Sequence, residues 1–453
     1  MQPLPKEFEE QMKRLLGEAG FFAYLDALNQ PYTRALRVNL LLRPDGTPPC
    51  PIEGLGAPVP WAKGAYFVEG DARPGLSPLH EGGLFYMQEP SALTAVTALD
   101  PQPGERVLDL CAAPGGKSTQ IAALMAGRGL LCCNEPIPSR AQILSRNIER
   151  MGVRNAVVLS AMPDALAPRF PAFFDRILVD APCSGEGMFR RQPEARDEWD
   201  ADAPRRCADR QMEILAQAAK MLRPGGTMVY STCTFNDTEN EGVLRRFLAL
   251  HLEFSLVPFA LPGLPEAKDG YLHLYPHEMR GEGHFVGRLK KADGANKADA
   301  PVQGAPQRKA PARAAAKGKA PAPIALPDVF SDAFAPERLY TAGDALWMLP
   351  EGISIERLSG LRVLRTGLLL AHAEGKRSEP DHALAMALRP EEAARTASLT
   401  QTQALAYQAG ETLSLGDLPG GYTLLCCEGV SLGWGKQAGG LMKNHYPKGL
   451  RRR

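Results

Sequence analysis

Apolar and polar positions follow two alternating patterns between residues 81 and 290. Short apolar runs bounded by polar residues or glycine are typical of buried strands. Such runs are VLDLC at 107–111, GLLCCNE at 129–135, AVVLS at 156–160, RILVDAP at 176–182 and GTMVYST at 226–232. Longer runs with helical spacing separate them, including residues 139–152 and 207–222. This alternation predicts an α/β fold with a doubly wound, mostly parallel sheet and helices on both faces.

The segment before this core follows a different pattern. Near the N-terminus, apolar side chains at helical spacing lie among charged ones and predict an amphipathic helix; they are Phe8, Met12, Leu15 and Leu16. Residues 31–44, PYTRALRVNLLLRP, indicate a strand edged by arginines. We therefore expect an α+β extension over residues 1–80, ahead of the core at 81–290.

The segments after the core differ from each other in composition. Residues 291–325 are rich in Ala, Pro, Lys and Gly and nearly lack large apolar residues. This stretch cannot bury a core, so we expect a flexible basic linker. Residues 326–453 return to ordinary composition, with short apolar runs and glycine turns. They predict a small mixed or β-rich C-terminal domain.

Composition and charge narrow the class of protein. The chain has 453 residues, of which 44% are hydrophobic and 23% charged, as in ordinary folded domains. Its formal net charge of +1 provides no overall field toward nucleic acid. Locally, residues 290–325 hold eight Lys or Arg against two Asp, a run that can contact phosphates or simply be solvated. No signal peptide and no apolar run of about 20 residues is found, so no membrane partner is expected.

The cysteines give no metal-binding pattern. None of the nine forms a CxxC pair, and no Cys/His cluster has zinc spacing, so no metal is expected. An odd number of cysteines without paired spacing is best explained by reduced thiols in a cytoplasmic protein. Most are expected to be small buried hydrophobic residues, namely Cys50, Cys111, Cys132, Cys133, Cys207, Cys426 and Cys427.

A glycine-rich turn follows the first strand of the core. In AAPGGKST, residues 112–119, the glycines allow a sharp bend and a close ligand, and the next helix offers unpaired N–H groups. The spacing is neither GxGxxG nor GxxxxGK[ST], which argues against a dinucleotide site and a P-loop. Glu135 ends the next strand, where a carboxylate can accept both ribose hydroxyls. A nucleoside site without a phosphate loop indicates S-adenosyl-L-methionine.

The expected cofactor site includes residues of several neighbouring loops. The turn contributes Cys111, Ala112, Ala113, Pro114, Gly115, Gly116 and Lys117. Further candidates are Arg140, Asp164, which follows the third strand, and Asp180, which ends the fourth. Because the carboxyl ends of parallel strands meet at one edge of a sheet, these side chains are expected to lie around one ligand.

Two other cysteines lie in polar loops at strand ends. Cys183 belongs to ILVDAPCSGEGMF at 177–189, and Cys233 belongs to MVYSTCTFNDTENE at 228–241. Each follows a strand and is expected beside the cofactor site. A thiol becomes a nucleophile when its pKa is lowered. Two such thiols beside a methyl donor suggest covalent chemistry on a methyl acceptor.

Together these motifs resemble those of the Fmu/Sun/nucleolar-protein family of RNA (cytosine-5) methyltransferases. The matching segments are DLCAAPGGKS, the glutamate of CCNE, both cysteine motifs and LFYMQEPSAL at 84–93. LGWGKQAGGLMKNHYPKGLR at 432–451 resembles the end of a small-subunit ribosomal RNA methyltransferase type within it. The resemblance implies a Rossmann-like core, an RNA-contacting N-terminal extension and a PUA-like, RNA-binding C-terminal domain.

The resemblance also implies individual roles. Cys233 is the thiol that adds to carbon 6 of cytosine and makes carbon 5 nucleophilic. Asp180 contacts the cytosine and supports protonation or hydrogen bonding at its nitrogen 3, and Lys117 orients Asp180 or stabilises charge. Cys183 is tied to release, in which carbon 5 loses its proton and the enzyme thiol is eliminated.

The implied substrate is a cytidine in RNA, extruded from its helix or loop to reach the cofactor. Candidate RNA contacts are Arg37, Asn39, Arg190 and Arg191, and, on a second surface, Lys443, Tyr446, Lys448 and Arg451–Arg453. We expect a monomer that acts on ribosomal RNA of the small subunit. The motifs leave transfer RNA as an alternative substrate. An RNA-binding ribosome assembly factor with vestigial activity is a further alternative, against which the intact cysteine pair and AAPGGK argue.

Overall fold

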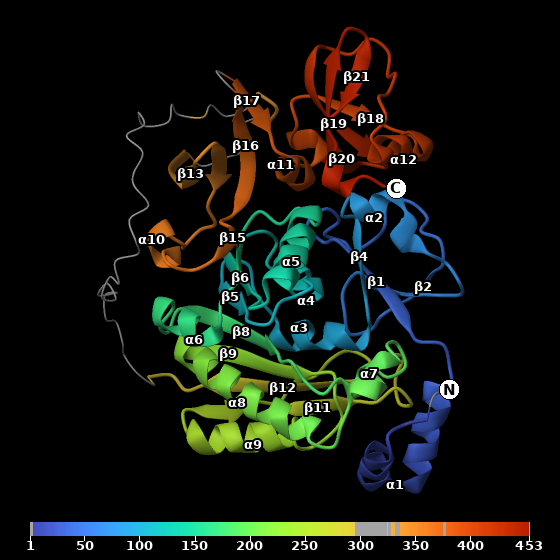
Figure 1. The fold of residues 1–453 in the computed structure, drawn as a ribbon, viewed down its shortest axis with the longest axis vertical. Coiled ribbons are helices and arrows are strands. Elements are labelled where there is room, and N and C mark those ends of the chain that lie inside the picture. Colours follow the sequence, from blue (N-terminus) through green and yellow to red (C-terminus); the bar gives the residue numbers. More distant parts are fainter. Residues whose placement is uncertain (1–2, 295–323, 325–327, 331–335, 375–376, 453) are drawn as a thin grey trace.

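The computed structural model describes residues 3–294, 324, 328–330, 336–374 and 377–452 (Figure 1). Most of the expected linker, residues 295–323 and 325, lies outside the described residues. Its first position, Lys291, is still the last residue of a strand.

A large sheet forms the centre of the molecule, in the order β10-β12-β9-β8-β5-β6-β7-β15 with β11 paired to β12. The parallel strands are β5 Arg106–Asp109, β6 Leu130–Asn134, β7 Ala156–Leu159, β8 Phe174–Asp180 and β9 Leu222–Thr232. Each coincides with an apolar run found in the sequence. The chain moves outward from β5 in both directions, which is the order of a doubly wound sheet. The predicted fold class is therefore confirmed.

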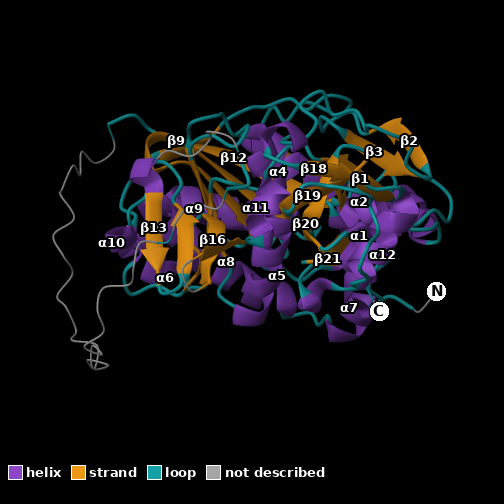
Figure 2. Ribbon diagram, turned by 90° about the horizontal axis from the view of Figure 1, so that it is seen from above, coloured by secondary structure: helices purple, strands orange, loops and turns teal. Residues whose placement is uncertain are grey.

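Helices pack on both faces of this sheet, and Figure 2 shows its strands β9 and β12 from above. Side chains alternate between the faces, and Val107 and Leu131 accordingly pack into one core while Leu108 and Cys132 pack into the other. The first core includes α3 Thr94–Leu99, α4 Gly116–Leu124 and α5 Pro138–Arg150. The second includes α6 Pro163–Leu166, α8 Ala203–Met221 and α9 Glu241–Leu250. Burial on both faces explains why these strands are continuous apolar runs.

One edge of the sheet is antiparallel, which the sequence did not predict. The strands there are β10 Phe254–Leu256, β11 Tyr271–Leu274 and β12 His284–Lys291. β12 pairs with β9 from Phe285 opposite Thr232 to Lys290 opposite Thr227. Because the two strands run in opposite directions, the first residues of β12 lie beside the carboxyl end of β9.

The predicted N-terminal helix is α1 Lys6–Leu28, and it is kinked at Gly17, whose φ is 69°. Phe8 and Met12 are buried, whereas Leu15 is 39% exposed because the packed face continues through Leu16 instead. The aromatic partners of α1 are Phe189, Trp199, Phe235 and Tyr275, all from the core. Figure 1 shows α1 beside α7 Glu194–Glu198, far along the sequence. The helix is therefore packed against the core at 81–290.

A small antiparallel sheet follows α1, in the order β2-β3-β1-β4. Its strands are β1 Arg34–Val38, β2 Leu55–Pro58, β3 Ala65–Val68 and β4 Phe85–Gln88. The short helix α2 Pro78–Glu81 precedes β4. The expected boundary at residue 80 therefore falls between elements of one structural unit, because β4 pairs with β1.

The C-terminal part has two further sheets. The first has the order β13-β14-β16-β17, with β13 Leu339–Ala342, β14 Ala345–Met348, β16 Leu368–Glu374 and β17 Arg377–Pro380. The second has the order β18-β19-β20-β21, with β18 Thr396–Ser398, β19 Gly421–Cys427, β20 Val430–Ala438 and β21 Leu441–Asn444. The helices are α10 Ile355–Leu358, α11 His382–Ala387 and α12 Gln401–Ala409.

The C-terminal part is docked on the core. β15 Val363–Arg365 pairs antiparallel with β7 and so becomes the last strand of the central sheet. Arg365 forms an ion pair with Glu149, and Arg154 forms one with Glu392. These contacts fix the C-terminal sheets against α5 and β7. Within the described ranges, no helix is long and apolar enough to cross a membrane.

Candidate active site

The sulfur atoms of Cys183 and Cys233 lie 3.3 Å apart. Their loops follow β8 and β9, which are neighbouring parallel strands with Asp180 opposite Ser231. Both cysteines are half-buried. Contact with Cys233 and burial raise the pKa of the Cys183 thiol, so Cys183 keeps its proton at neutral pH. The strand register thus brings together two thiols that are far apart in the sequence.

Asp180 lies beside this pair and receives hydrogen bonds on both oxygens. Lys117 Nζ donates to Oδ2 and Ser231 Oγ donates to Oδ1, each over 2.8 Å. Burial raises the pKa of Asp180, but the Lys117 ammonium and the Ser231 hydroxyl outweigh it, so the pKa is lowered and the group is a carboxylate. Asp180 also raises the pKa of Lys117 against the opposing effect of burial. The result is an ion pair at the end of β8.

A buried polar cluster joins the two cysteine loops. Glu186 lies in the first loop and Glu239 in the second, and both side chains are fully buried. Asn236 Nδ2 donates to Glu186 Oε1 over 3.0 Å and to Glu239 Oε1 over 2.8 Å. Glu239 also accepts from Ser184 N over 3.0 Å and from Gln211 Nε2 over 2.9 Å. These bonds fix the positions of both loops, and sequence reasoning missed them although the residues lie in the two cysteine motifs.

Helix α1 supports the same loops from outside. Gln11 Nε2 donates to Glu186 Oε1 over 2.9 Å. The Phe8 and Phe189 rings meet edge to face at 4.9 Å, and Tyr24 meets Phe235 at 5.7 Å. Edge-to-face aromatic pairs add to the stabilisation from burial. The position of the thiol loops therefore depends on the first helix of the chain.

The glycine turn between β5 and α4 is closely packed on its inner side. Gly115 has φ 115°, and a Cβ there would lie 3.2 Å from Leu144 and 3.3 Å from Asn147. A Cβ at Gly116 would lie 3.2 Å from the Tyr86 ring and 3.3 Å from the Gln88 side chain. Glycine is thus required at 115 by both its backbone conformation and its neighbours.

Behind the turn lies Asp109, a fully buried carboxyl group at the end of β5. Ser118 Oγ donates to Asp109 Oδ2 over 2.6 Å. Burial raises the pKa of Asp109 to about 7, although the Ser118 hydrogen bond opposes the rise. This acid was not singled out from the sequence, because its burial is set by α4.

Glu135, Arg140 and the turn come together as predicted from the order of the strands. Glu135 is 3% exposed, and its Oε1 accepts from Ile137 N over 3.0 Å. Its Oε2 lies 3.5 Å from Arg140, whose other nitrogen donates to Ala113 O over 3.2 Å. Asp164 is exposed at the first turn of α6, after β7, the strand next to β6.

Two exposed apolar side chains stand beside these carboxylates, and the sequence did not indicate them. Ile137 is 49% exposed two residues after Glu135, and Met162 is 60% exposed two residues before Asp164. Exposed apolar groups at adjacent strand ends suit the flat faces of a nucleobase.

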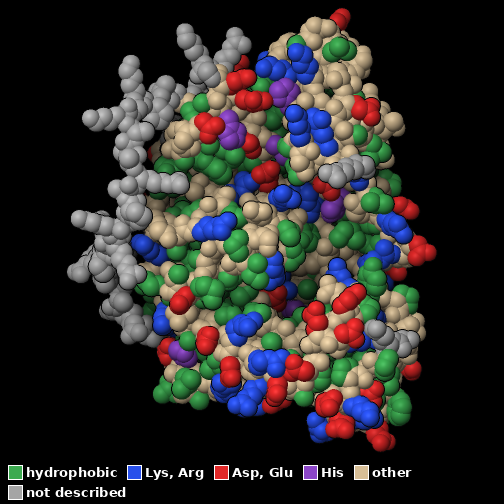
Figure 3. Space-filling model, viewed as in Figure 1, with side chains coloured by type: hydrophobic (Ala, Val, Ile, Leu, Met, Phe, Trp, Pro, Cys, Tyr) green, Lys and Arg blue, Asp and Glu red, His purple; other side chains and the backbone are tan. Residues whose placement is uncertain are grey.

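Most of the expected phosphate contacts next to the core are wrong. Arg37 is 1% exposed and donates to Thr119 Oγ1 over 2.8 Å and to Gly116 O over 3.2 Å, so it holds the glycine turn. Asn39, also 1% exposed, donates to Gly83 O and Met151 O. Arg190 is paired with Glu282. Arg191 is exposed, and basic and acidic side chains are interspersed over the face seen in Figure 3.

The second expected RNA surface is also only partly exposed. Tyr446 is 4% exposed and packs against Tyr407 and His382, so it cannot stack on a base. Lys443 and Lys448 are exposed. Arg451 and Arg452 are half-buried, and Arg453 lies outside the described residues.

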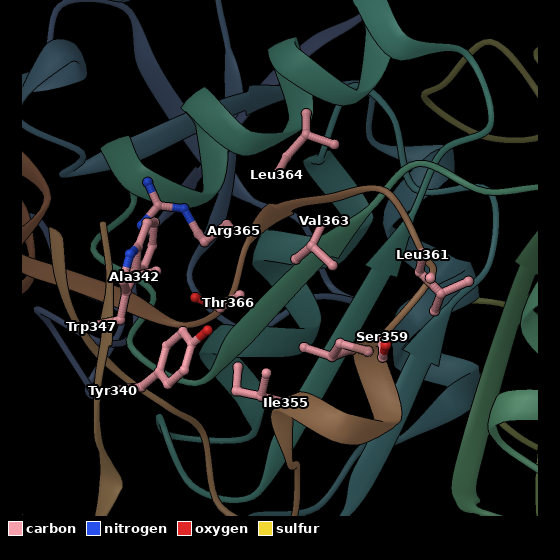
Figure 4. A pocket seen from close by; sticks show the side chains of 12 residues that line it. Tyr340, Ala342, Trp347, Ile355, Ser359, Leu361, Val363, Leu364, Arg365 and Thr366 are labelled. Atoms are coloured by element: carbon pink, nitrogen blue, oxygen red, sulfur yellow. The ribbon is translucent and has the colours of Figure 1, made fainter. Parts of the chain in front are cut away.

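A pocket of about 390 Å³ lies away from the thiols, between β13, β14, α10 and β15. Figure 4 shows Tyr340, Trp347 and Arg365 together at one side of it and Leu361 at the other. A second pocket, of about 450 Å³, is lined by residues of the N-terminal extension, the core and the C-terminal part, among them Leu40, Met151 and Arg389. Neither of these two pockets is lined by Cys183, Cys233 or Asp180. In the described part of the chain, no group of His, Cys, Asp or Glu is arranged to hold a metal ion.

Four family models match consecutive parts of the chain. "N-terminal domain of 16S rRNA methyltransferase RsmF" matches residues 4–90, and "16S rRNA methyltransferase RsmB/F" matches 96–290. "RsmF rRNA methyltransferase first C-terminal domain" matches 327–388, and "Methyltransferase RsmF PUA domain" matches 394–452. The resemblance seen in the motifs is thereby confirmed, and the last domain is PUA-like.

Curated relatives named ribosomal RNA small subunit methyltransferase F match nearly the whole chain. The protein from Erwinia tasmaniensis is 34% identical, with 98% of this chain and 96% of the relative covered. The one from an Enterobacter species is 35% identical, with 98% and 95% covered.

Two solved structures resemble the fold. A methyltransferase homolog protein from Pyrococcus horikoshii is 30% identical, with a TM-score of 0.53 over 63% of this chain and 95% of that one. NSun6 from the same organism is 22% identical, with a TM-score of 0.55 over 64% and 98%. They agree with the Rossmann-like fold described above.

Proposed function

The chain belongs to the ribosomal RNA small subunit methyltransferase F family, and we propose that it transfers a methyl group from S-adenosyl-L-methionine to carbon 5 of a cytidine in small-subunit ribosomal RNA. Methylation of ribosomal RNA is the activity of the family. The observation that supports carbon 5 of cytosine is the pair of thiols 3.3 Å apart beside the Asp180–Lys117 ion pair. One thiol can bond to the base while the other assists its release.

The residues around the glycine turn fit the proposed cofactor. The inner side of the turn is filled by Leu144, Asn147 and Tyr86, so a ligand would lie against its outer side, where Pro114 is exposed. Glu135 Oε1 accepts from a backbone N–H and Oε2 lies 3.5 Å from Arg140, and each oxygen keeps a further lone pair with which to accept a ribose hydroxyl. Ile137 and Met162 would flank the adenine. S-adenosyl-L-methionine bound there supplies the sulfonium methyl group.

We assign Cys233 to bond formation with carbon 6. As the sulfur–carbon bond forms, the double bond shifts from carbons 5 and 6 to carbons 4 and 5, and the proton that the thiol gives up is matched by one taken up at nitrogen 3. Nitrogen 3 gains negative charge in this step, and Lys117, held by the Asp180 carboxylate, supplies the hydrogen bond or proton that stabilises it. Lys117 interacts electrostatically with both Asp180 and Cys233, so its positive charge lies near the group that contacts the base and near the thiol that bonds to it.

We assign Cys183 to release. Carbon 5 must give up its proton to a base while the bond between carbon 6 and the Cys233 sulfur breaks. Cys183 lies within contact of that sulfur and keeps its own proton. As a neutral thiol it can donate a hydrogen bond to the departing thiolate, which stabilises the leaving group.

Denaturing gel electrophoresis with substrate RNA and labelled cofactor tests this assignment. Cys233→Ala is expected to form neither adduct nor product, whereas Cys183→Ala is expected to accumulate a methylated covalent complex. Cys50→Ala is a control, because Cys50 lies in the N-terminal part away from both loops. An adduct with the Cys233 variant but none with the Cys183 variant would reverse the roles. Full activity of both variants would exclude the two-thiol mechanism.

The same experiment addresses the alternatives. A transfer RNA substrate would give adducts with transfer RNA rather than with small-subunit ribosomal RNA, while an assembly factor would bind RNA without any adduct. We further propose that the N-terminal extension and the PUA-like domain contact RNA. Because all nine cysteines are free and the chemistry needs reduced thiols, we also propose that the protein acts in the cytoplasm.

A further inference from the structure

His284 is a buried side chain at the active site that has no hydrogen-bond partner. It is 2% exposed, and neither ring nitrogen is hydrogen-bonded. A buried polar group without a partner costs about 1–3 kcal/mol. Its presence therefore calls for an explanation other than stability of the resting fold.

The strand register directs His284 toward Asp180. Asp180 is opposite Ser231, and Ser231 is opposite Val286, so these three residues lie on one face of the sheet. His284 is two residues before Val286 and thus lies on that face as well. Gly283, with φ 104°, turns the chain into β12 at this point, and a Cβ there would collide with the Phe235 ring. The position of the imidazole is therefore fixed by the fold.

The ring is close to the carboxylate but not bonded to it. His284 Nε2 lies 3.6 Å from Asp180 Oδ1, the oxygen that already accepts from Ser231. Burial and the neighbouring Lys117 lower the pKa of His284 to about 3, although Asp180 opposes the shift. The imidazole is thus uncharged at neutral pH, and one of its nitrogens carries a hydrogen that can be donated.

We propose that His284 is a positioning residue of the reaction, which donates a hydrogen bond from Nε2 to Asp180 Oδ1 when cytosine is bound and keeps the carboxylate directed at the base. This inference rests on the proposed function, in which Asp180 contacts the cytosine. Closing the distance to a normal hydrogen bond requires a movement of about 0.7 Å. As Lys117 shares its proton with the reacting base, Ser231 and His284 continue to hold Oδ1.

Two substitutions of similar size separate hydrogen bonding from packing. His284→Gln keeps an N–H donor near the Nε2 position, whereas His284→Leu fills the space without one. We expect the leucine variant to lose about tenfold in kcat, the effect of one hydrogen bond to a charged group, with the affinity for S-adenosyl-L-methionine unchanged. The glutamine variant is expected to recover to within about threefold of the parent. His382→Leu is the control, because His382 is a buried histidine of α11 in the C-terminal part.

The measurements are kcat, KM for RNA, cofactor affinity and thermal unfolding of each variant, with Asp180→Asn in parallel. A leucine variant with the parent kcat would overturn the inference, and so would equal losses in the leucine and glutamine variants. A loss confined to KM would also contradict it, since a positioning residue acts on the bound base. An Asp180→Asn variant with full activity would remove Asp180 from the reaction and the inference with it, whereas a parent enzyme that forms no 5-methylcytidine in small-subunit ribosomal RNA would refute the proposed function itself.

Discussion

Cys183 Sγ lies 3.3 Å from Cys233 Sγ, with both side chains half-buried at the ends of adjacent strands. A disulfide bond needs about 2.05 Å between sulfurs, and the loops are near enough to close that gap. Hydrogen peroxide is therefore expected to link the two thiols and stop methyl transfer, and dithiothreitol is expected to restore it. Peptide mass mapping would identify the pair. Irreversible loss of activity, or a link involving other cysteines, would contradict this expectation.

Glu135 is expected to contribute strongly to cofactor affinity. Replacing it by Ala removes a carboxylate placed to accept two ribose hydroxyls, and hydrogen bonds to charged groups contribute about 1.5–3 kcal/mol each. We expect affinity to fall at least about tenfold by calorimetry. Asp209→Ala, at an exposed acid of α8, is the matched control. Unchanged affinity of the Glu135 variant would remove this residue from the site.

Asp109 is expected to make stability depend on pH. Its pKa is about 7 in the fold and 3.8 when unperturbed, so the folded state holds a proton that the unfolded state loses first. Stability from this group is complete below pH 3.8, declines as pH rises, and is lost above about pH 7. At 1.36 kcal/mol per pKa unit the decline approaches about 4 kcal/mol.

Asp109→Asn tests this dependence. The amide oxygen still accepts from Ser118, but the group no longer titrates. We expect the free energy of unfolding of the variant to fall less between pH 4 and pH 7 than that of the parent. Parallel curves for the two proteins in urea titrations would show that Asp109 is not the source.

The shared amide of Asn236 is expected to be essential to the thiol loops. Asn236→Ala leaves Glu186 and Glu239 as buried carboxyl groups without their common donor. We expect a loss of about 1–3 kcal/mol in unfolding free energy and a slower covalent step. Asn236→Asp should be worse, because it adds a third acid to the cluster. A stable and fully active Asn236→Ala variant would refute this role.

The two halves of the chain are expected to remain associated after cleavage. The composition of residues 291–325 predicts that a protease cuts there first. β15 pairs with β7 and Arg365 with Glu149, so the fragments should co-elute in gel filtration. Arg365→Ala should weaken the association. Separation of the parent fragments would show that the docking is weak.

The sequence predicted the parallel strands and the cysteine motifs, but it did not predict which polar side chains would be buried. The parallel strands were found because burial on both faces makes them continuous apolar runs, and the meeting of Cys183 with Cys233 followed from the strand-end rule. β12 was missed because HFVGRLKK mixes apolar, glycine and basic residues. Arg37 was misjudged because its partners, Thr119 and Gly116, come from a distant helix. Local patterns reveal elements and motifs, whereas burial of a charge depends on which elements meet.

The position of α1 has a consequence for how the enzyme folds. Gln11 of α1 and Glu186, which it contacts, are 175 residues apart, and Thr33, which follows α1, donates its backbone N–H to Glu282 across 249 residues. Such contacts have a high loop-closure cost and form late, since the intervening chain must already be ordered. On the ribosome, the first helix emerges long before any of its aromatic partners exist. The two cysteine loops are thus expected to mature last, and methyl transfer should appear in refolding experiments only after the central sheet has formed.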